Sequence, residues 1–215
     1  MSTSRNILKE IESLALKRNK MAFISGPRQV GKTTLSKTFI HKKNGKYLNW
    51  DNLDFRRLWT KSPKDSLTDL KENSTLILDE IHKADKWKQN LKGVYDTLEK
   101  KIRIIVTGSA RLDLYKKGSD SLMGRYLSFR LHPFSIGEML SSNLPSPKKI
   151  KKSLLDNFKL SPSAKLQSAW NDLTLYGGFP EPLFAANKKI LNIWHKGRIE
   201  KIVREDLRDL SNIPE

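Results

Sequence analysis

The sequence has no cysteine among its 215 residues, which excludes both disulfides and thiolate metal sites. It also lacks any apolar run close to the roughly 20 residues that a membrane-spanning helix needs. Residues 1–18 are polar and amphipathic, without the continuous apolar stretch of a signal peptide. We therefore expect a protein with no membrane span and a cytoplasmic location.

Acidic residues are scarce relative to basic ones. The chain has 23 Asp and Glu against 41 Lys and Arg, for a net charge of +18 and a pI near 10.0. Such a surplus favours contact with nucleic acid or with an acidic protein. The basic residues are spread along the chain, however, and solvated lysine faces account for most of them. Nucleic acid and an acidic protein are both candidate partners on this basis.

A complete phosphate-binding motif of the form G-x-x-x-x-G-K-T occupies residues 26–33. The apolar run 21–24 before it predicts a buried strand, and residues 34–40 after it carry apolar side chains at helical spacing. A glycine turn with a chance lysine is the alternative, but strand, loop and helix are the context that the motif requires. The motif predicts a nucleotide site formed by Gly26, Pro27, Arg28, Gln29, Val30, Gly31, Lys32, Thr33 and Thr34.

The chemistry of phosphate binding explains these residue types. Gly26 and Gly31 allow backbone conformations in which successive N–H groups converge on the β-phosphate. The helix that begins near Lys32 adds its unpaired amides and the positive end of its dipole. We expect Lys32 to reach the β- and γ-phosphates and the Thr33 hydroxyl to bind Mg²⁺.

Two adjacent acids, Asp79 and Glu80, follow the apolar run 75–78. In phosphoryl-transfer sites one acid holds Mg²⁺ and a second orients and deprotonates the attacking water. Adjacent residues of a strand point to opposite faces, so we assign Asp79 to the metal and Glu80 to catalysis. The alternative is a pair of acids that only solvates the end of a strand.

Hydroxyls and a cation also lie at the end of the apolar run 103–107 and directly after it. Thr107 or Ser109 could sense the γ-phosphate by hydrogen bonding, and Arg111 could face it. A glycine turn in which Ser109 caps a helix at 112–116 is an equally good interpretation of that serine. This strand end therefore adds Thr107, Ser109 and Arg111 to the candidate nucleotide site.

Asp51 and Asp54 follow a short predicted strand at 47–50. Open α/β sheets place their ligands at the carboxyl ends of strands, so either acid could contact Mg²⁺ through water, or a substrate. Acids in this position more often cap the next helix, expected here at 55–59. We favour the capping interpretation.

The sequence divides near Pro133. Residues 1–133 alternate apolar strands with helical segments, which predicts an α/β P-loop core. Residues 134–215 predict a small helical subdomain, interrupted at about 141–163 by a stretch rich in Ser, Pro and Lys that is typical of a flexible insertion.

Several motifs together resemble one protein family. They are the loop 26–33, the acids 79–80, the segment 107–111, the Gly-Arg-Tyr at 124–126 followed by His-Pro-Phe-Ser at 132–135, and Tyr-Gly-Gly-Phe-Pro-Glu at 176–181. The chain resembles, over about residues 5–212, the prokaryotic AAA-superfamily ATPases whose phosphate loop reads GPRQVGKTTL. The first two motifs occur in many nucleotide hydrolases, whereas the Gly-Arg-Tyr and Gly-Gly-Phe-Pro-Glu elements are far more particular.

The resemblance implies a parallel five-stranded sheet in the order 5-1-4-3-2, flanked by helices and followed by a helical lid. It implies ATP and Mg²⁺ as cofactors, with Lys32 and Glu80 catalytic and Thr33 and Asp79 on the metal. Arg125 becomes a candidate catalytic arginine, acting in cis or from a neighbouring subunit of a homo-oligomer; an ordinary exposed arginine is the alternative. Family members usually continue past the helix at 204–207 into a further domain, and this sequence ends at Glu215, so the resemblance implies that the usual C-terminal domain is lacking.

Three functions follow as hypotheses. The first is a Mg-dependent ATPase that hydrolyses the β-γ bond and couples it to movement of the lid. The second is a nucleotide-dependent switch or binding module with little turnover, and the third is a basic nucleic-acid-binding protein with an accessory ATP site. ATP is favoured over GTP because the Asn-Lys-x-Asp signature of guanine pockets is absent from the strand end at 107–110.

Overall fold

The computed structural model describes residues 5–41, 44–109, 112, 122–140 and 163–202. The chain divides into two compact units, Met1–His132 and Pro133–Glu215. None of the helices in the described ranges combines the length and the apolar character that a membrane-spanning segment needs. Arg111, residues 141–162 of the expected insertion and the expected helix at 204–207 lie outside the described residues.

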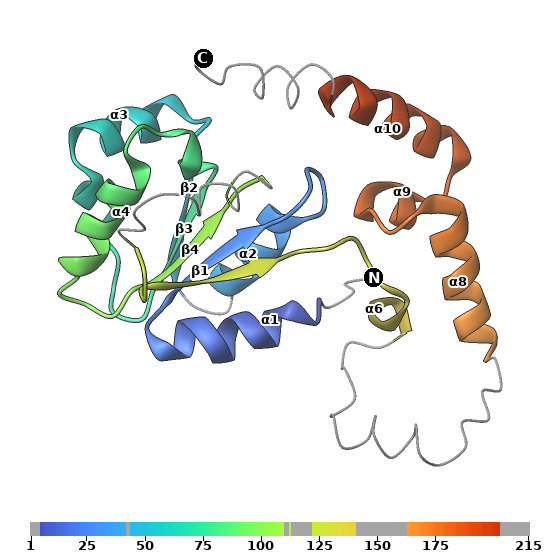
Figure 1. Ribbon diagram of the computed structural model, residues 1–215, viewed down its shortest axis with the longest axis horizontal. Helices are drawn as coiled ribbons and strands as arrows, with labels where there is room; N and C mark the ends of the chain where they lie inside the picture. The colour runs from blue at the N-terminus through green and yellow to red at the C-terminus, as the bar shows by residue number, and fades with distance from the viewer. Residues whose placement is uncertain (1–4, 42–43, 110–111, 113–121, 141–162, 203–215) are drawn as a thin grey trace, which may run out of the picture. The chain divides into compact units, whose positions relative to one another are not determined.

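A sheet of five parallel strands forms the centre of the first unit, and Figure 1 shows β1 lying between β4 and β5. The strand order is β2-β3-β4-β1-β5, which read from the other edge is the order 5-1-4-3-2 implied by the resemblance. The predicted fold class is therefore confirmed. The strands are β1 (Met21–Ser25), β2 (Gly45–Asn49), β3 (Thr75–Asp79), β4 (Arg103–Thr107) and β5 (Tyr126–Arg130).

The central strands are near-continuous apolar runs because both faces of a parallel sheet are covered. Every residue of β1 and β3 is buried. The register pairs Thr107 with Ile24 on one side and with Asp79 on the other. The carboxyl ends of β1, β3 and β4 therefore meet at one edge, which we call the carboxyl edge.

Helices cover the sheet. Phe55 and Trp59 of α3 and Leu91 of α4 share one apolar core with Phe23 and Leu78 of the strands. Burying an aliphatic or Phe side chain of this kind fully stabilises the fold by about 1.5–3 kcal/mol. The helix α2 packs on β2, β3 and β4. The helical segments that follow β1 are α2 (Lys32–His41), α3 (Leu53–Lys61), η3 (Pro63–Leu67), η4 (Ile81–Lys83) and α4 (Trp87–Asp96).

The segment before β1 is a helix of changing pitch. It comprises α1 (Ile7–Glu10), the π-helical turn η1 (Ile11–Ala15) and the 3-10 turn η2 (Leu16–Arg18). Asn19 ends it in the left-handed conformation, with φ of 55°. The buried side chains of this segment are Ile11, Ala15 and Leu16, and η1 packs against β1 and β5.

The described part of the second unit is helical. Ser163 accepts a hydrogen bond from the N–H of Leu166, and Asn187 accepts from Lys189 and Ile190, so each side chain caps the helix that follows it. The helix α8 packs against α6 and α9, and α9 packs against α10. The helices are α6 (Ile136–Leu140), α8 (Ala164–Tyr176), α9 (Pro180–Ala185) and α10 (Lys188–Lys201).

Candidate functional site

The loop between β1 and α2 requires its glycines. Gly26 has φ of 151° and Gly31 has φ of 96°, conformations that residues with a side chain rarely adopt. A Cβ at Gly26 would also lie 2.4 Å from the carbonyl oxygen of Leu131, and the N–H of Leu131 donates to Ser25 O at 2.8 Å. The loop is therefore held tightly against the segment that leaves β5.

Lys32 is the first residue of α2, and its side chain folds back over the loop. The ammonium donates to the carbonyl oxygens of Gly26 at 2.9 Å and Pro27 at 2.8 Å. Burial lowers the pKa of Lys32, and the nearby carboxylates of Glu80 and Asp79 oppose that shift. This places a desolvated cation at the N-terminus of a helix, the arrangement suited to a phosphate group.

Asp79 ends β3 and accepts hydrogen bonds from three hydroxyl groups. Thr33 Oγ1 donates to Asp79 Oδ2 at 2.8 Å, Tyr47 donates to the same oxygen at 2.7 Å, and Thr107 Oγ1 donates to Oδ1. The carboxylate is nearly inaccessible to solvent, since Asp79 is only 4% exposed. A carboxylate and a threonine hydroxyl in contact are the oxygen ligands that Mg²⁺ prefers, so these residues fit the metal that the sequence predicted.

Glu80 lies just beyond the end of β3 and is in the left-handed conformation, with φ of 57°. Its N–H donates to Thr107 O at 2.9 Å. Its carboxylate oxygen lies 3.6 Å from His82 Nε2 and 3.7 Å from Lys83 Nζ. Burial raises the pKa of Glu80, while Lys83 acts in the opposite direction. The alternating pleat does not set the direction of this side chain, because the strand has already ended and the backbone turns at Glu80.

Two residues near these acids were not predicted from the sequence. The first is Tyr47 of β2, whose ring lies 4.1 Å from Lys37 Nζ and whose hydroxyl accepts from Asn49 Nδ2 at 3.3 Å. Burial, reinforced by Asp79, raises the pKa of Tyr47, so its hydroxyl remains a donor at neutral pH. The available signal was the alternation of β2, which places Tyr47 and Asn49 on one face of the strand.

The second is His82, which is 7% exposed. It lies under the turn that follows β4, since a Cβ at Gly108 would lie 2.6 Å from His82 Nδ1. His82 therefore contacts both the turn next to Ser109 and the carboxylate of Glu80. A lone histidine in the sequence carried no signal of this placement.

The structure does not bring all the predicted residues together. Arg125 precedes β5 and its carbonyl accepts from Met21 N, so it lies at the opposite edge of the sheet, which we call the amino edge. Its guanidinium donates to both carboxylate oxygens of Asp96, at 2.7 Å and 3.0 Å. Ser109 follows β4 at the carboxyl edge and its carbonyl accepts from the N–H of Leu112.

Asp51 and Asp54 do not cap α3 with their side chains. The capping residue is Asn52, whose side-chain oxygen accepts from the N–H groups of Asp54 and Phe55. Asp51 instead accepts from Lys83 Nζ at 2.8 Å, and Asp54 lies 3.9 Å from Arg57. The capping expectation was wrong in its residues, because the turn after β2 places Asn52 at the position before the helix.

A match to a family model shows which protein family the chain belongs to. Residues 18–140, more than half of the chain, match the model described as an AAA domain. The chain belongs to the AAA domain family. The match spans β1 to β5 and includes the loop 26–33 and the acids at positions 79 and 80, so the resemblance noted in the sequence is confirmed as an AAA-type P-loop protein.

This AAA-family chain is also similar to longer proteins. It is 29% identical over 170 residues to an uncharacterised protein of Methanocaldococcus jannaschii, covering 76% of this chain and 36% of that protein. It is 22% identical over 200 residues to an uncharacterised protein of Haemophilus influenzae, covering 86% of this chain and 45% of that protein. The chain thus spans less than half the length of these two relatives.

Two solved structures share the fold. The Walker-type ATPase PABY2304 of Pyrococcus abyssi aligns with a TM-score of 0.55 at 14% identity, covering 97% of this chain and 75% of that one. The RuvB protein of Thermotoga maritima aligns with a TM-score of 0.51 at 19% identity, covering 84% of this chain and 59% of that one.

Proposed function

We propose that this AAA-family protein binds ATP with Mg²⁺ and hydrolyses the β-γ phosphate bond. The observation that carries the proposal is the 2.8 Å hydrogen bond between Thr33 and Asp79, which joins the phosphate loop to the acid of β3. Lys32 lies at the start of the same helix, and the pKa of Lys32 responds to both Asp79 and Glu80. These contacts support a proposed site that combines the loop cation, the hydroxyl and the two acids.

Each residue has a distinct role in this proposal. The N–H groups of the loop 26–31 and the ammonium of Lys32 bind and orient the β- and γ-phosphates. The Thr33 hydroxyl and the Asp79 carboxylate would hold Mg²⁺. When bound, that ion would neutralise the charge that develops on the phosphate oxygens. Thr107 and Tyr47 hold the Asp79 carboxylate in a fixed orientation through their hydroxyls.

Glu80 is the proposed general base. It would accept a proton from the attacking water, since burial raises its pKa and so strengthens it as a base. Its left-handed backbone costs of order 1–3 kcal/mol, and such strain is characteristic of functional positions. The hydrogen bond from its own N–H to Thr107 O fixes the backbone that presents the carboxylate.

The helical unit Pro133–Glu215 would act as the lid. The segment that follows β5 is hydrogen-bonded to the end of β1, since Leu131 N donates to Ser25 O at 2.8 Å. Both residues belong to the first unit, and Leu131 precedes the helical unit by two positions in the chain. A shift of the phosphate loop would therefore act on the backbone that leads to the helical unit, which is the basis of the proposed coupling.

The test is phosphate release from Mg-ATP by the wild type and by Glu80→Gln. We expect the variant to lose about 100-fold or more in rate while retaining ATP affinity, because general-base catalysis contributes roughly 10²–10⁴-fold. Equal rates for the two proteins would remove hydrolysis by Glu80 from the proposal. A chain that fails to bind ATP at all would remove the nucleotide site as well.

A nucleotide-dependent switch with little turnover is the second candidate. The position of Lys83 favours it, because its ammonium lies 3.7 Å from Glu80 and 2.8 Å from Asp51 and so holds a cation beside the proposed base. This candidate predicts tight ATP binding that Lys32→Ala abolishes, with no phosphate release. Turnover by the wild type that depends on Glu80 would exclude it.

A further inference from the structure

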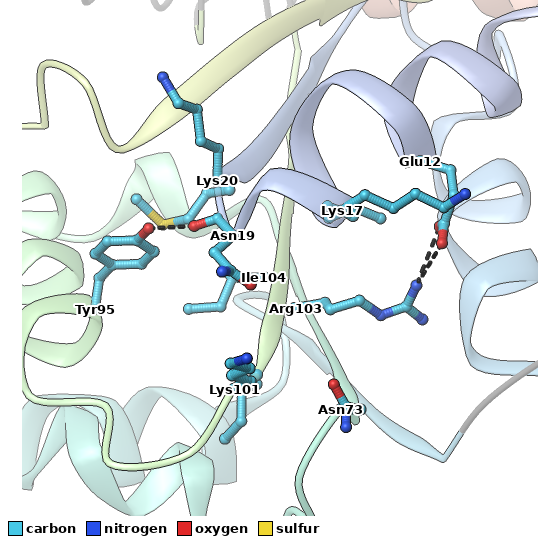
Figure 2. A pocket seen from close by; sticks show the side chains of 12 residues that line it. Glu12, Lys17, Asn19, Lys20, Asn73, Tyr95, Lys101, Arg103 and Ile104 are labelled. Atoms are coloured by element: carbon cyan, nitrogen blue, oxygen red, sulfur yellow. Dashed lines mark hydrogen bonds and ion pairs between the residues drawn. The ribbon is translucent and has the colours of Figure 1, made fainter.

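A pocket with a volume of about 270 Å³ opens at the amino edge of the sheet (Figure 2). It lies between the end of η2, the first residues of β1 and β4, and the turn that precedes β3. Its apolar lining includes the buried side chains of Leu16, Met21 and Ile104. The five residues of β1 separate it from the phosphate loop by about 16 Å, at the usual rise of 3.3 Å per residue.

The charged groups that line the pocket are mainly cations: Lys17, Lys20, Lys101 and Arg103 against the single carboxylate of Glu12. The guanidinium of Arg103 already has hydrogen-bond partners within the protein. Its Nη1 donates to both oxygens of Glu12, at 3.1 Å and 3.3 Å, and its Nη2 donates to Thr75 Oγ1 at 2.6 Å, as Figure 2 shows in part. The opposite charges of Arg103 and Glu12 therefore cancel, and the net positive charge of the pocket comes from the three lysines.

These three lysines are uncompensated. Among the described residues, none of the ammonium groups of Lys17, Lys20 and Lys101 has a hydrogen-bond or ion-pair partner. Figure 2 shows the three lysine side chains extending in different directions, Lys17 from η2, Lys20 from the link between η2 and β1, and Lys101 from the segment before β4. Cations of one sign around a concave surface focus the electric field and concentrate anions there.

The backbone that carries the lysines is held in place. Lys20 N donates to Ala15 O at 3.0 Å, and Lys101 O accepts from Asn73 N at 2.6 Å. The Tyr95 hydroxyl donates to Asn19 O, which ties the end of η2 to α4. A ligand would therefore have to order the lysine side chains but not the backbone that carries them, which reduces the entropic cost of binding.

We propose that this pocket binds a phosphate-bearing anion of the size of a diphosphate or of one nucleotide unit. The volume lies just below the range of typical small-molecule sites, about 300–1,000 Å³, which suits a small ligand. Lysine binds phosphate as a point charge and needs no bidentate geometry. The ligand phosphate belongs either to a free phosphorylated molecule or to a nucleic-acid strand, and the inference does not depend on ATP hydrolysis at the other edge.

The experiment uses the full chain with Lys32→Ala, so that the phosphate loop does not contribute to binding. Calorimetry measures the affinity for pyrophosphate and for a short single-stranded oligonucleotide at several salt concentrations. The test variant adds Lys17→Ala, Lys20→Ala and Lys101→Ala. The matched control instead removes three lysines that do not line the pocket, by Lys61→Ala, Lys64→Ala and Lys188→Ala. Thermal melting checks that both triple variants remain folded.

We expect the pocket variant to lose affinity at least tenfold more than the control for one of the two probes. A loss confined to pyrophosphate assigns the pocket to a free phosphorylated molecule. A loss of affinity for the oligonucleotide assigns the pocket to a nucleic-acid strand. The slope of log affinity against log salt concentration should then fall by about 2 in magnitude, since each phosphate contact of a single strand contributes about 0.7 to that slope. Equal losses in the two triple variants, or no binding of either probe, would overturn the proposal.

Discussion

The two edges of the sheet use the same kinds of charged residue in opposite ways. At the carboxyl edge Lys32 lies over the phosphate loop with two carboxylates close enough to affect its pKa, and Lys83 lies 3.7 Å from Glu80. At the amino edge Lys17, Lys20 and Lys101 line a pocket, and none of the three has a carboxylate partner among the described residues. In the first arrangement the cations lie close to acids and are hydrogen-bonded, and in the second the lysines carry unpaired positive charge.

This difference shows why net charge alone says little about function. The net charge of +18 is a sum in which every lysine contributes equally, whatever its surroundings in the fold. In the fold, a buried lysine close to acids can orient a phosphate group that reacts. Lysines without acidic partners that line a pocket can attract an anion that is bound but does not react. The same residue type therefore predicts two different sensitivities to mutation.

The largest expected effect comes from making one substitution at each edge. Lys32→Ala should weaken ATP binding by about 100-fold, since a hydrogen bond to a charged group is worth about 1.5–3 kcal/mol. Lys20→Ala should leave ATP binding at the phosphate loop unchanged, because Lys20 lies at the amino edge. Titration of each variant with a fluorescent ATP analogue gives the two affinities. Similar losses in both variants would mean that ATP does not bind selectively at the phosphate loop.

A second pair of substitutions compares two tyrosine hydroxyls. Tyr47→Phe removes the donor to Asp79 at the carboxyl edge, and Tyr95→Phe removes the donor to Asn19 at the amino edge. Losing one hydrogen bond worth about 1–1.5 kcal/mol should raise the Mg²⁺ concentration for half-maximal nucleotide binding about five- to tenfold in Tyr47→Phe alone. Nucleotide binding measured across a Mg²⁺ titration provides the readout. An unchanged Mg²⁺ requirement in Tyr47→Phe would show that this hydroxyl does not position the metal ligand.

Much of the carboxyl edge could be predicted from the sequence because its chemistry is local. The loop 26–33 and the acids at 79 and 80 follow apolar strands directly, so each motif could be placed at a strand end. Tyr47 could not be found in this way, since its role depends on β2 pairing with β3 in a register that brings its hydroxyl to Asp79. His82 was missed for the same reason, because only the packing of the turn at Gly108 gives it a place beside Glu80.

The amino edge was harder to predict because no motif marks it. Its pocket is formed by three segments that are far apart in the sequence, around Lys17, Asn73 and Lys101. The change of pitch at η1 also has no sequence signature. Arg125 illustrates the limit of motif transfer, since a residue of a family motif lies at the edge away from the phosphate loop.

A smaller effect should appear in the pH dependence of hydrolysis. Burial raises the pKa of Glu80, and the nearby ammonium of Lys83 lowers it. A general base works only when deprotonated, so removing Lys83 should shift the acidic limb of the rate profile to higher pH. We expect this shift for Lys83→Ala measured against the wild type at saturating Mg-ATP. Lys86→Ala, at an exposed neighbouring position, is the control and should leave the profile unchanged; a shift to lower pH in Lys83→Ala would contradict the assignment of Glu80.

The smallest effect is expected for Arg125→Ala. Arg125 is paired with Asp96 at the amino edge, and an exposed ion pair contributes little to stability. Within one chain the substitution should therefore change neither ATP affinity nor the melting temperature appreciably. Phosphate release measured over a range of protein concentrations sharpens the comparison between the edges. If the wild-type rate per chain rises with concentration and that of Arg125→Ala does not, the arginine acts on the phosphate loop of a neighbouring copy, and the amino edge of one chain serves the carboxyl edge of another.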